Sequence, residues 1–340
     1  MIKYIGSKRT LVPRIERIVR GLPVTSACDL FAGTTRVAQA LRCLGLHVVA
    51  NDLASYSEAF GRAYVERAER GRIPELLAAL RESEPRRGYV TETFCEQARF
   101  FRPENGMRID GIRTAIDELD LDPVERGTLL TALLEAADRV DSTVGVQMAY
   151  LKQWAPRALQ PLELREPPLC PGPPGRVTRV DANELAAALD DVDLAYVDPP
   201  YNQHSYFSNY HVWETIVRGD EPAHYGTACK RVDCRTTKSR YNSRRDAGRA
   251  LAELVAALPT PWLVLSFNDE GFANPDELRA LLAERGYVGT AIVDSNRYVG
   301  ARIGIHNPRG EKVGTVGRLR NRELLFVVGP DRSAVESALA

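Results

Sequence analysis

The tetrapeptide Asp198-Pro199-Pro200-Tyr201 carries the residue types best suited to chemistry. It directly follows the apolar run 194–197, which is typical of a buried parallel strand ending at the carboxyl edge of an open sheet, where α/β proteins place their chemistry. Asp198 offers a carboxylate acceptor, the prolines stiffen the turn and leave a backbone carbonyl outside any helix or ladder, and Tyr201 supplies a flat ring. These groups suit an exocyclic amino group on a planar base held out of its helix. The alternative is an ordinary proline turn.

A second group of residues follows two earlier apolar runs and suits a cofactor. The segment Asp29-Leu30-Phe31-Ala32-Gly33-Thr34 predicts a strand-to-helix turn, where glycine lets the backbone approach a ligand and the helix start offers free N–H donors. Asp52 ends the second run, where a carboxylate typically binds ribose hydroxyls. These features fit NAD, FAD or S-adenosylmethionine, and an ordinary tight turn is the alternative. Thr35 and Ala38 stand where a dinucleotide fingerprint has glycines, which favours S-adenosylmethionine because it has no phosphate.

Seven apolar runs predict the strands of a parallel sheet that positions these turns. They are residues 26–31, 46–50, 176–180, 194–198, 262–267, 288–293 and 323–328. The chain between the second and third runs is mostly helical in pattern and ends in a Pro/Gly-rich linker at 169–175. We therefore expect an α/β fold in which residues 1–55 and 176–340 form a catalytic, cofactor-binding domain and residues 56–175 form a helical insertion.

Composition restricts the class of protein. The 340 residues predict one large or two ordinary domains, and 44% apolar with 26% charged residues is typical of a soluble globular chain. We expect no membrane helix and no signal peptide. Six cysteines without a CxxC pair indicate reduced thiols in a cytoplasmic protein, and no ligand cluster predicts a metal. Because 45 basic residues balance 45 acidic ones, binding of nucleic acid requires a local basic patch.

One such patch lies in the predicted loop segment 219–249, which we expect over the mouth of the active site. Its residues 230–249 include eight basic side chains against two acidic ones, interleaved with polar groups that suit phosphates and base edges. A solvated basic face is the alternative. The predicted DNA contacts are Lys230, Arg231, Arg235, Lys238, Arg240 and Asn242.

The aromatic-rich segment 206–214 after the tetrapeptide allows two interpretations. It suits the lining of a pocket for an extruded base, and its spacing equally suits the core face of a helix. We expect Trp213 to lie in the core and His211 to be a hydrogen-bonded structural residue, and we leave Tyr206 open.

The motifs and their order resemble the D12 class of DNA adenine-N6 methyltransferases, the group that includes the Dam-type enzymes, in its alpha arrangement. Tyr4-Ile5-Gly6-Ser7-Lys8 resembles the amino-terminal segment that contacts the methionine part of the cofactor. The turn 29–33 resembles the family's glycine turn, Asp52 its ribose-binding acid, and Asp181 the acid that meets the adenine moiety of the cofactor. Asp198-Pro199-Pro200-Tyr201 matches the catalytic tetrapeptide, and 265–268 and 322–325 resemble later strand motifs.

The resemblance implies a Rossmann-like, S-adenosylmethionine-dependent methyltransferase that acts on N6 of a flipped adenine in double-stranded DNA. It also implies target recognition by the helical insertion, and it leaves open whether a cognate restriction endonuclease is a partner or the enzyme is a solitary or phage-related methylase. Ser7 and Thr35 replace family glycines, so cofactor contacts at these points are in question. The recognition sequence and oligomeric state stay open. The rival hypotheses are a methyltransferase of RNA, protein glutamine or cytosine N4, and a catalytically idle DNA-binding module.

Overall fold

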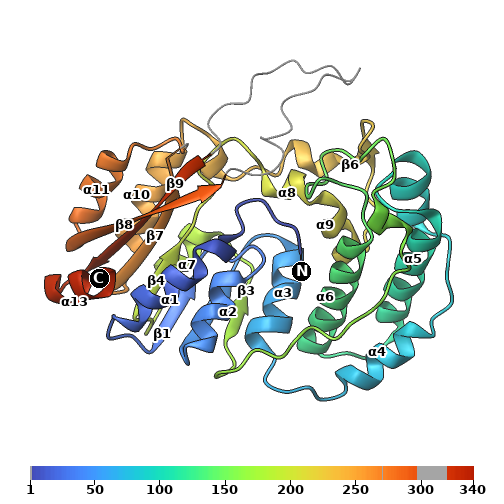
Figure 1. The fold of residues 1–340 in the computed structure, drawn as a ribbon, viewed down its shortest axis with the longest axis horizontal. Coiled ribbons are helices and arrows are strands. Elements are labelled where there is room, and N and C mark those ends of the chain that lie inside the picture. The colour runs from blue at the N-terminus through green and yellow to red at the C-terminus, as the bar shows by residue number, and fades with distance from the viewer. Residues whose placement is uncertain (1, 270, 297–319) are drawn as a thin grey trace.

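A seven-stranded sheet organises one half of the molecule (Figure 1). The computed structural model describes residues 2–269, 271–296 and 320–340. The strand order is β3-β2-β1-β4-β7-β9-β8. The strands are β1 (Ser26–Asp29), β2 (His47–Asn51), β3 (Arg176–Thr178), β4 (Leu194–Val197), β7 (Trp262–Asn268), β8 (Tyr287–Asn296) and β9 (Arg320–Gly329).

All seven predicted strands form, but the expectation of a wholly parallel sheet is wrong for one of them. β9 lies between β7 and β8 and runs antiparallel to both. The remaining neighbours, from β3 through β2, β1 and β4 to β7, pair in parallel. An apolar run does not reveal strand direction here, because β9 is buried on both faces just as the parallel strand β4 is.

Helices cover both faces of the sheet, so successive strand residues enter different cores. Leu194 and Tyr196 pack with α1, α2 and α13, whereas Ala195 and Val197 pack with α7, α10 and α11. These helices are α1 (Val12–Arg20), α2 (Arg36–Cys43), α7 (Ala182–Ala188), α10 (Ala247–Ala257), α11 (Pro275–Ala283) and α13 (Arg332–Leu339). Burial on both faces explains why the strand before the tetrapeptide is continuously apolar.

A third core lies in the helical half, at the other side of Figure 1. It is built by α3 (Ser55–Gly61), α4 (Ile73–Arg81), α5 (Pro103–Glu118) and α6 (Pro123–Arg139), with π-helical segments at Arg62–Glu66 and Val90–Gln97. Pro74, Pro103 and Pro123 lie in the first turns of their helices, where a missing N–H removes no helical bond. α9 (His211–Arg218) packs into this core as well. The assignment of target recognition to residues 56–175, and of catalysis and cofactor binding to residues 1–55 and 176–340, stays a prediction.

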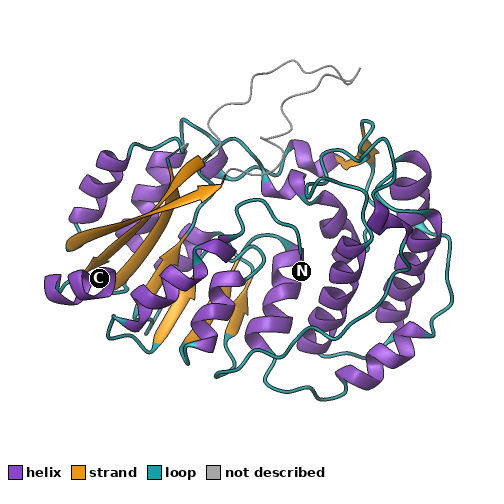
Figure 2. Ribbon diagram, viewed as in Figure 1, coloured by secondary structure: helices purple, strands orange, loops and turns teal. Residues whose placement is uncertain are grey.

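Two short strands, β5 (His224–Tyr225) and β6 (Lys230–Arg231), form a separate antiparallel ribbon within the segment 219–249. Figure 2 shows this ribbon beside the helices, apart from the main sheet. The linker 169–175 has neither helix nor strand, as predicted. No helix in the described residues is long and apolar enough to cross a membrane.

The topology creates a crevice between β1 and β4. From β1 the chain continues to β2 and β3 on one side, whereas from β4 it continues to β7 on the other. The connections therefore diverge at the carboxyl ends of these two neighbouring strands, which is where open α/β sheets bind ligands. Asp29 ends β1 and Asp198 directly follows β4, so both flank this crevice.

Candidate active site

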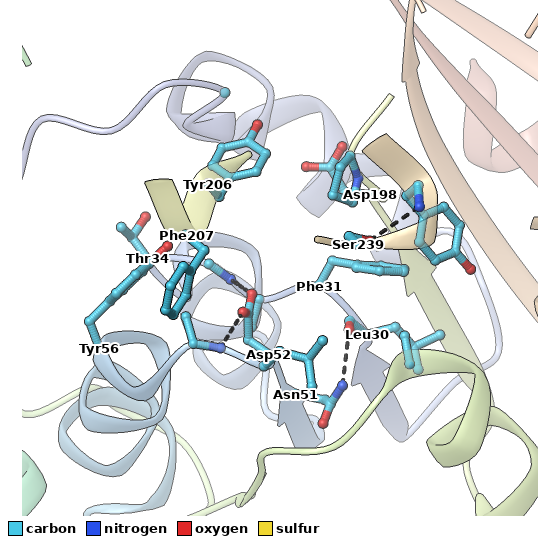
Figure 3. Close-up of a pocket in the computed structure, with 18 of the residues that line it drawn as sticks. Leu30, Phe31, Thr34, Asn51, Asp52, Tyr56, Asp198, Tyr206, Phe207 and Ser239 are labelled. Atoms are coloured by element: carbon cyan, nitrogen blue, oxygen red, sulfur yellow. Dashed lines mark hydrogen bonds between the residues drawn. The ribbon is translucent and has the colours of Figure 1, made fainter. Parts of the chain in front are cut away.

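A cavity of about 580 Å³ opens at the carboxyl edge of the sheet. Figure 3 shows that Phe31, Asp52, Asp198, Tyr206 and Phe207 border it. It is lined by all the residues predicted to bind the cofactor, which are Tyr4, Gly6, Lys8, Asp29, Phe31, Gly33, Thr34, Asp52, Asp181 and Asp198. Segments that are far apart in the sequence thus meet around one space, although their contact with a cofactor stays a prediction.

The glycine turn approaches the cavity through two left-handed residues. Gly33 has φ +51°, and a Cβ there would lie 3.2 Å from the ring of Tyr4. Thr35, which replaces a family glycine, has φ +60° and is the N-cap of α2. Positive φ is unfavourable for a β-branched residue. The turn therefore keeps the backbone geometry that a glycine would adopt, at a cost in strain.

Asp52 and Asp29 both fasten this turn and both line the cavity, and Figure 3 shows Asp52 at its border. Asp52 Oδ2 accepts from the Gly33 amide at 2.9 Å, and its Oδ1 accepts from the Ala54 amide at 3.0 Å. Burial raises the pKa of Asp52, and these amides oppose the rise. Asp29 is buried and accepts from the Ala38 amide in the first turn of α2 at 3.1 Å. Burial, then Asp198, raises the pKa of Asp29 to about 8.

Asp198 forms a buried charge cluster with Lys8 and Glu323. Lys8 Nζ lies 3.0 Å from Asp198 Oδ1 and 3.3 Å from Glu323 Oε2, and the three side chains are 7%, 16% and 12% exposed in that order. Burial raises the pKa of Asp198 to about 6, even though Lys8 opposes the rise. Burial lowers the pKa of Lys8, but Asp198 and Glu323 more than offset this and raise it well above its ordinary value.

No role was predicted for Glu323 from the sequence. Its Oε1 accepts from Asn268 Nδ2 at 2.8 Å, across the antiparallel pair of β7 and β9. The strand motif 322–325 was visible in the sequence, but nothing local indicated that its acid meets Lys8, which lies 315 residues away.

The tetrapeptide divides between two cavities. Asp198 and Pro200 line the main one, whereas Pro199, Pro200 and Tyr201 line a smaller one of about 220 Å³. The ring of Tyr201 packs against Phe267 at 5.7 Å between centroids, and Lys8 Nζ lies 5.7 Å from its centre. Stacking of Tyr201 on a base therefore stays a prediction.

An aromatic stack connects the cavity to the helical core. Tyr206 stacks on Tyr4 at 5.4 Å, Tyr4 on Tyr210 at 4.5 Å, and Tyr210 on Trp213 at 4.6 Å. A Cβ at Gly6 would lie 2.5 Å from the Tyr206 hydroxyl, so this stack also requires glycine there. Tyr206, which the sequence left open, lines the cavity at one end of the stack.

Two residues of the aromatic-rich segment occupy the predicted core positions. Trp213 is 2% exposed and lies in the helical core. His211 is buried, and its Nε2 lies 2.8 Å from the Gln147 carbonyl oxygen. Burial lowers the pKa of His211 to about 3. The imidazole is therefore neutral and structural, as expected.

The prediction that Arg231 contacts DNA is corrected by the structure. This side chain is buried, and its guanidinium is 2.6 Å from Asp220 and 2.8 Å from Asp233. Its Nη1 also donates to Thr215 Oγ1 at 3.3 Å. Arg231 thus fastens the segment 219–249 to α9, and its charge is already neutralised.

The other predicted DNA contacts differ in their exposure and in whether they already bind a partner within the chain. Lys238 and Asn242 line the main cavity, and Lys238 is exposed. Asn242 Nδ2 donates to the carbonyls of Asn202 and His204 at 2.8 and 3.0 Å, so it holds the loop after the tetrapeptide. Arg240 is 2.6 Å from Glu253. Lys230 is half-buried, and Arg235 is exposed with its guanidinium 4.1 Å from the centre of the Tyr225 ring.

Comparison with known proteins gives the family. A family model described as "D12 class N6 adenine-specific DNA methyltransferase" matches residues 4–257. The chain belongs to this family. The match includes the amino-terminal segment, the glycine turn, the helical insertion and the catalytic tetrapeptide. Within the described part of the chain, no group of three His, Cys, Asp or Glu side chains is arranged for a metal ion.

Curated relatives of this D12 methyltransferase are modification enzymes. It is 32% identical over 301 residues to the type II methyltransferase M.NlaIII of Neisseria lactamica, covering 84% of this chain and 89% of that protein. It is 27% identical to the type II methyltransferase M.CviAII of Paramecium bursaria Chlorella virus 1, covering 87% and 92%. Its 29% identity with modification methylase StsI of Streptococcus sanguinis covers 83% of this chain but 46% of that protein.

A solved structure of magnesium protoporphyrin IX methyltransferase from Synechocystis PCC 6803 with bound SAM aligns at a TM-score of 0.34 and 11% identity, covering 96% of this chain and 80% of that one. The Rossmann-like fold rests instead on the sheet order described above. Family membership confirms the predicted adenine-specific DNA methyltransferase activity and S-adenosylmethionine as methyl donor.

Proposed function

We propose that this D12 methyltransferase transfers a methyl group to N6 of an adenine turned out of duplex DNA, with Asp198 as the acceptor that activates the amino group. The observation that carries this assignment is the position of Asp198. Its carboxylate lies at the end of β4, is largely buried, borders the cavity that Asp52 and the glycine turn also line, and is held by Lys8.

The residues around the cavity fit S-adenosylmethionine. The volume of about 580 Å³ lies within the range typical of small-molecule sites. Asp52 would hold the ribose hydroxyls, Asp181 and Phe31 would border the adenine ring, and Tyr4 and Gly6 the methionine part. Asp181 already caps α7 through the Asn183 amide at 2.9 Å, which fixes its side chain at the edge of the cavity. The bound cofactor supplies an electrophilic methyl group on a sulfonium.

Asp198 performs the chemistry at the amino group. The lone pair of adenine N6 is delocalised into the ring, so the nitrogen is a poor nucleophile. Hydrogen bonds from N6–H to the Asp198 carboxylate and the Pro199 carbonyl favour a pyramidal nitrogen and stabilise the positive charge that develops on it. Because its pKa is about 6, Asp198 is ionised at neutral pH. It is also a better proton acceptor than an ordinary aspartate.

The DNA-facing side is the exposed part of the segment 219–249. Lys238 is exposed and lines the cavity, so it would meet a phosphate near the extruded nucleotide. Turning a base out of the duplex costs a few kcal/mol, and stacking on an aromatic ring such as Tyr201 would return about 1–3 kcal/mol. Tyr206 and Phe207 border the cavity from α8 (Tyr206–Asn209) and would enclose the reacting groups.

The names of the relatives support a role in restriction and modification of DNA. Modification methylase StsI and the type II methyltransferases suggest that this enzyme has a cognate restriction endonuclease with the same recognition sequence, and that both act on DNA in the cytoplasm. Expression of a restriction endonuclease of the proposed cognate specificity, with and without this methyltransferase, tests the partnership. Host DNA should be cut only when the methyltransferase is absent.

Replacement of Asp198 tests the catalytic assignment. Asp198→Asn keeps the size of the side chain but replaces the anionic acceptor, so single-turnover methyl transfer should fall by about 10²–10³-fold. Cofactor affinity, measured by calorimetry, should fall much less than the rate, because the other predicted cofactor contacts, such as Asp52, remain in place. A variant that retains more than a tenth of the wild-type rate would contradict the role of Asp198.

A further inference from the structure

Lys8, Asp198 and Glu323 form a cluster with an uneven charge balance. One ammonium lies between two carboxylates, at 3.0 Å from Asp198 and 3.3 Å from Glu323. Lys8 on Asp198 alone would be a neutral pair, whereas the cluster of three carries one net negative charge. Glu323 Oε1 also accepts a hydrogen bond from the side-chain amide of Asn268 at 2.8 Å.

We infer that Glu323 is a positioning residue for methyl transfer, which holds the Lys8 ammonium and leaves the cluster around Asp198 net negative. This inference rests on the proposed role of Asp198 as the acceptor for the amino group. Glu323 acts through Lys8 and does not itself contact the base. Neither the tetrapeptide nor the cofactor motifs of the sequence assign it this role.

The charge that moves during the reaction explains why the balance matters. The methyl group leaves a sulfonium and bonds to the neutral amino nitrogen, so positive charge disappears at sulfur and appears at N6 until its proton is lost. A neutral Lys8–Asp198 pair would stabilise that charge weakly, because the ammonium repels it as the carboxylate attracts it. Glu323 offsets the ammonium, and low exposure keeps solvent from screening the effect.

The position of Glu323 also restricts where Lys8 points. An ammonium has three donors and can rotate on a flexible stem. With Glu323 in the first half of β9 and Asp198 directly after β4, Lys8 is held between these two carboxylates. Lys8 and Asp198 both line the cavity, so Glu323 determines where the ammonium lies beside the carboxylate that accepts the amino group.

Other ionisable groups near Asp198 act on it in the same way in every variant proposed below. Asp29 at the end of β1 and Tyr196 in β4 interact with the Asp198 charge, and so does Tyr206 from α8. Tyr201 interacts with Lys8. The variants leave all four residues in place, so differences between their pH profiles report on Lys8 and Glu323.

The test compares single-turnover rates of methyl transfer from pH 5 to 9 in Glu323→Gln, Lys8→Met, Glu323→Asp and the wild type. Glu323→Gln keeps an acceptor for Asn268 and removes the charge, so the plateau rate should fall about ten-fold or more, equivalent to ~1.4 kcal/mol, with unchanged cofactor affinity. Glu323→Asp should recover part of the rate. Glu336→Gln, which removes an exposed carboxylate of α13, is the matched control and should behave as the wild type.

The pH profile separates positioning from a general loss of structure. Glu323 raises and Lys8 lowers the pKa of Asp198, so the acid limb should move to lower pH in Glu323→Gln and to higher pH in Lys8→Met. A wild-type rate and pH profile for Glu323→Gln would overturn the inference. So would a shift of the acid limb in the same direction in Glu323→Gln and Lys8→Met. Asp198→Asn in the same series distinguishes the failures: an active Asp198→Asn refutes the proposed function, whereas an inactive one with a wild-type Glu323→Gln refutes only the role of Glu323.

Discussion

The carboxyl edge of the sheet and the segment 219–249 use their charges in opposite ways. At the sheet edge, a few buried charges converge on one cavity, and Asp198 is held by a single ammonium. In the segment, several cations are neutralised by nearby acids, as Arg231 is by Asp220 and Asp233. A count of basic residues therefore overstates the charge available for DNA, whereas residues at parallel strand ends meet because the strands share an edge.

The largest effect on stability should come from Arg231, which the structure places in a buried ion cluster. Arg231→Ala would leave Asp220 and Asp233 without their buried partner, and should lower the free energy of unfolding by about 2–3 kcal/mol, at or below the lower end for buried pairs because both acids are partly exposed. Urea unfolding measures this, with Arg235→Ala as the exposed control. A stable Arg231→Ala protein with weakened DNA binding would restore the original interpretation.

Asp52 tests whether a carboxylate that lines the cavity at the sheet edge binds the cofactor. Asp52→Asn removes the charge and keeps an oxygen for only one of the two amides of Gly33 and Ala54, which bond different carboxylate oxygens. It should weaken cofactor binding about ten-fold or more, or ~1.4 kcal/mol. The rate of the chemical step should change less, since ribose is bound alike in ground and transition states. Asp331→Asn is the matched control, because Asn caps α13 equally well. Unchanged cofactor affinity in Asp52→Asn would remove this residue from the site.

Buried and exposed carboxylates should also differ in their response to pH. Burial raises the pKa of Asp198 to about 6, and the ionised form is the one that accepts the amino group. Methyl transfer should therefore fall as pH drops through 6, and at pH 5 it should be about ten-fold slower than at pH 8. Single-turnover rates with saturating DNA and cofactor measure this limb. A rate that stays constant down to pH 4.5 would exclude Asp198 as the titrating group.

The smallest effect concerns a single phosphate contact. Lys238→Ala should reduce DNA affinity a few-fold and reduce the slope of log K against log salt by about 0.9. Arg240→Ala should change the slope less, because Arg240 is already paired with Glu253. Fluorescence titrations at several salt concentrations compare the two. Equal changes in slope would show that pairing within the chain does not limit contact with DNA.

Much of the sheet half follows from local pattern. Each strand is short, apolar and bounded by turn residues, so its existence could be predicted from neighbouring residues alone. Parallel strands then bring Asp29, Asp52 and Asp198 to one edge without further information. The direction of β9 was not accessible in this way, because a strand buried on both faces has the same apolar pattern in either direction.

Contacts between distant segments could not be predicted. Lys8 meets Glu323 only because β9 is inserted beside β7 and places its first acid near the amino-terminal segment. Likewise, Arg231 is buried because Asp220, Asp233 and Thr215 surround it in three dimensions. The sequence shows only that these residues are charged. Which of the charges stay exposed to a ligand depends on the ion pairs that form in the folded structure.

The identity of the methylated base shows whether Asp198 serves methylation of adenine. Duplex DNA of mixed sequence is incubated with the enzyme and S-adenosylmethionine, digested to nucleosides and analysed by mass spectrometry. We predict N6-methyladenine as the product of the wild type and its loss in Asp198→Asn. N4-methylcytosine as the main product, or N6-methyladenine at wild-type yield and rate from Asp198→Asn, would contradict the proposed function.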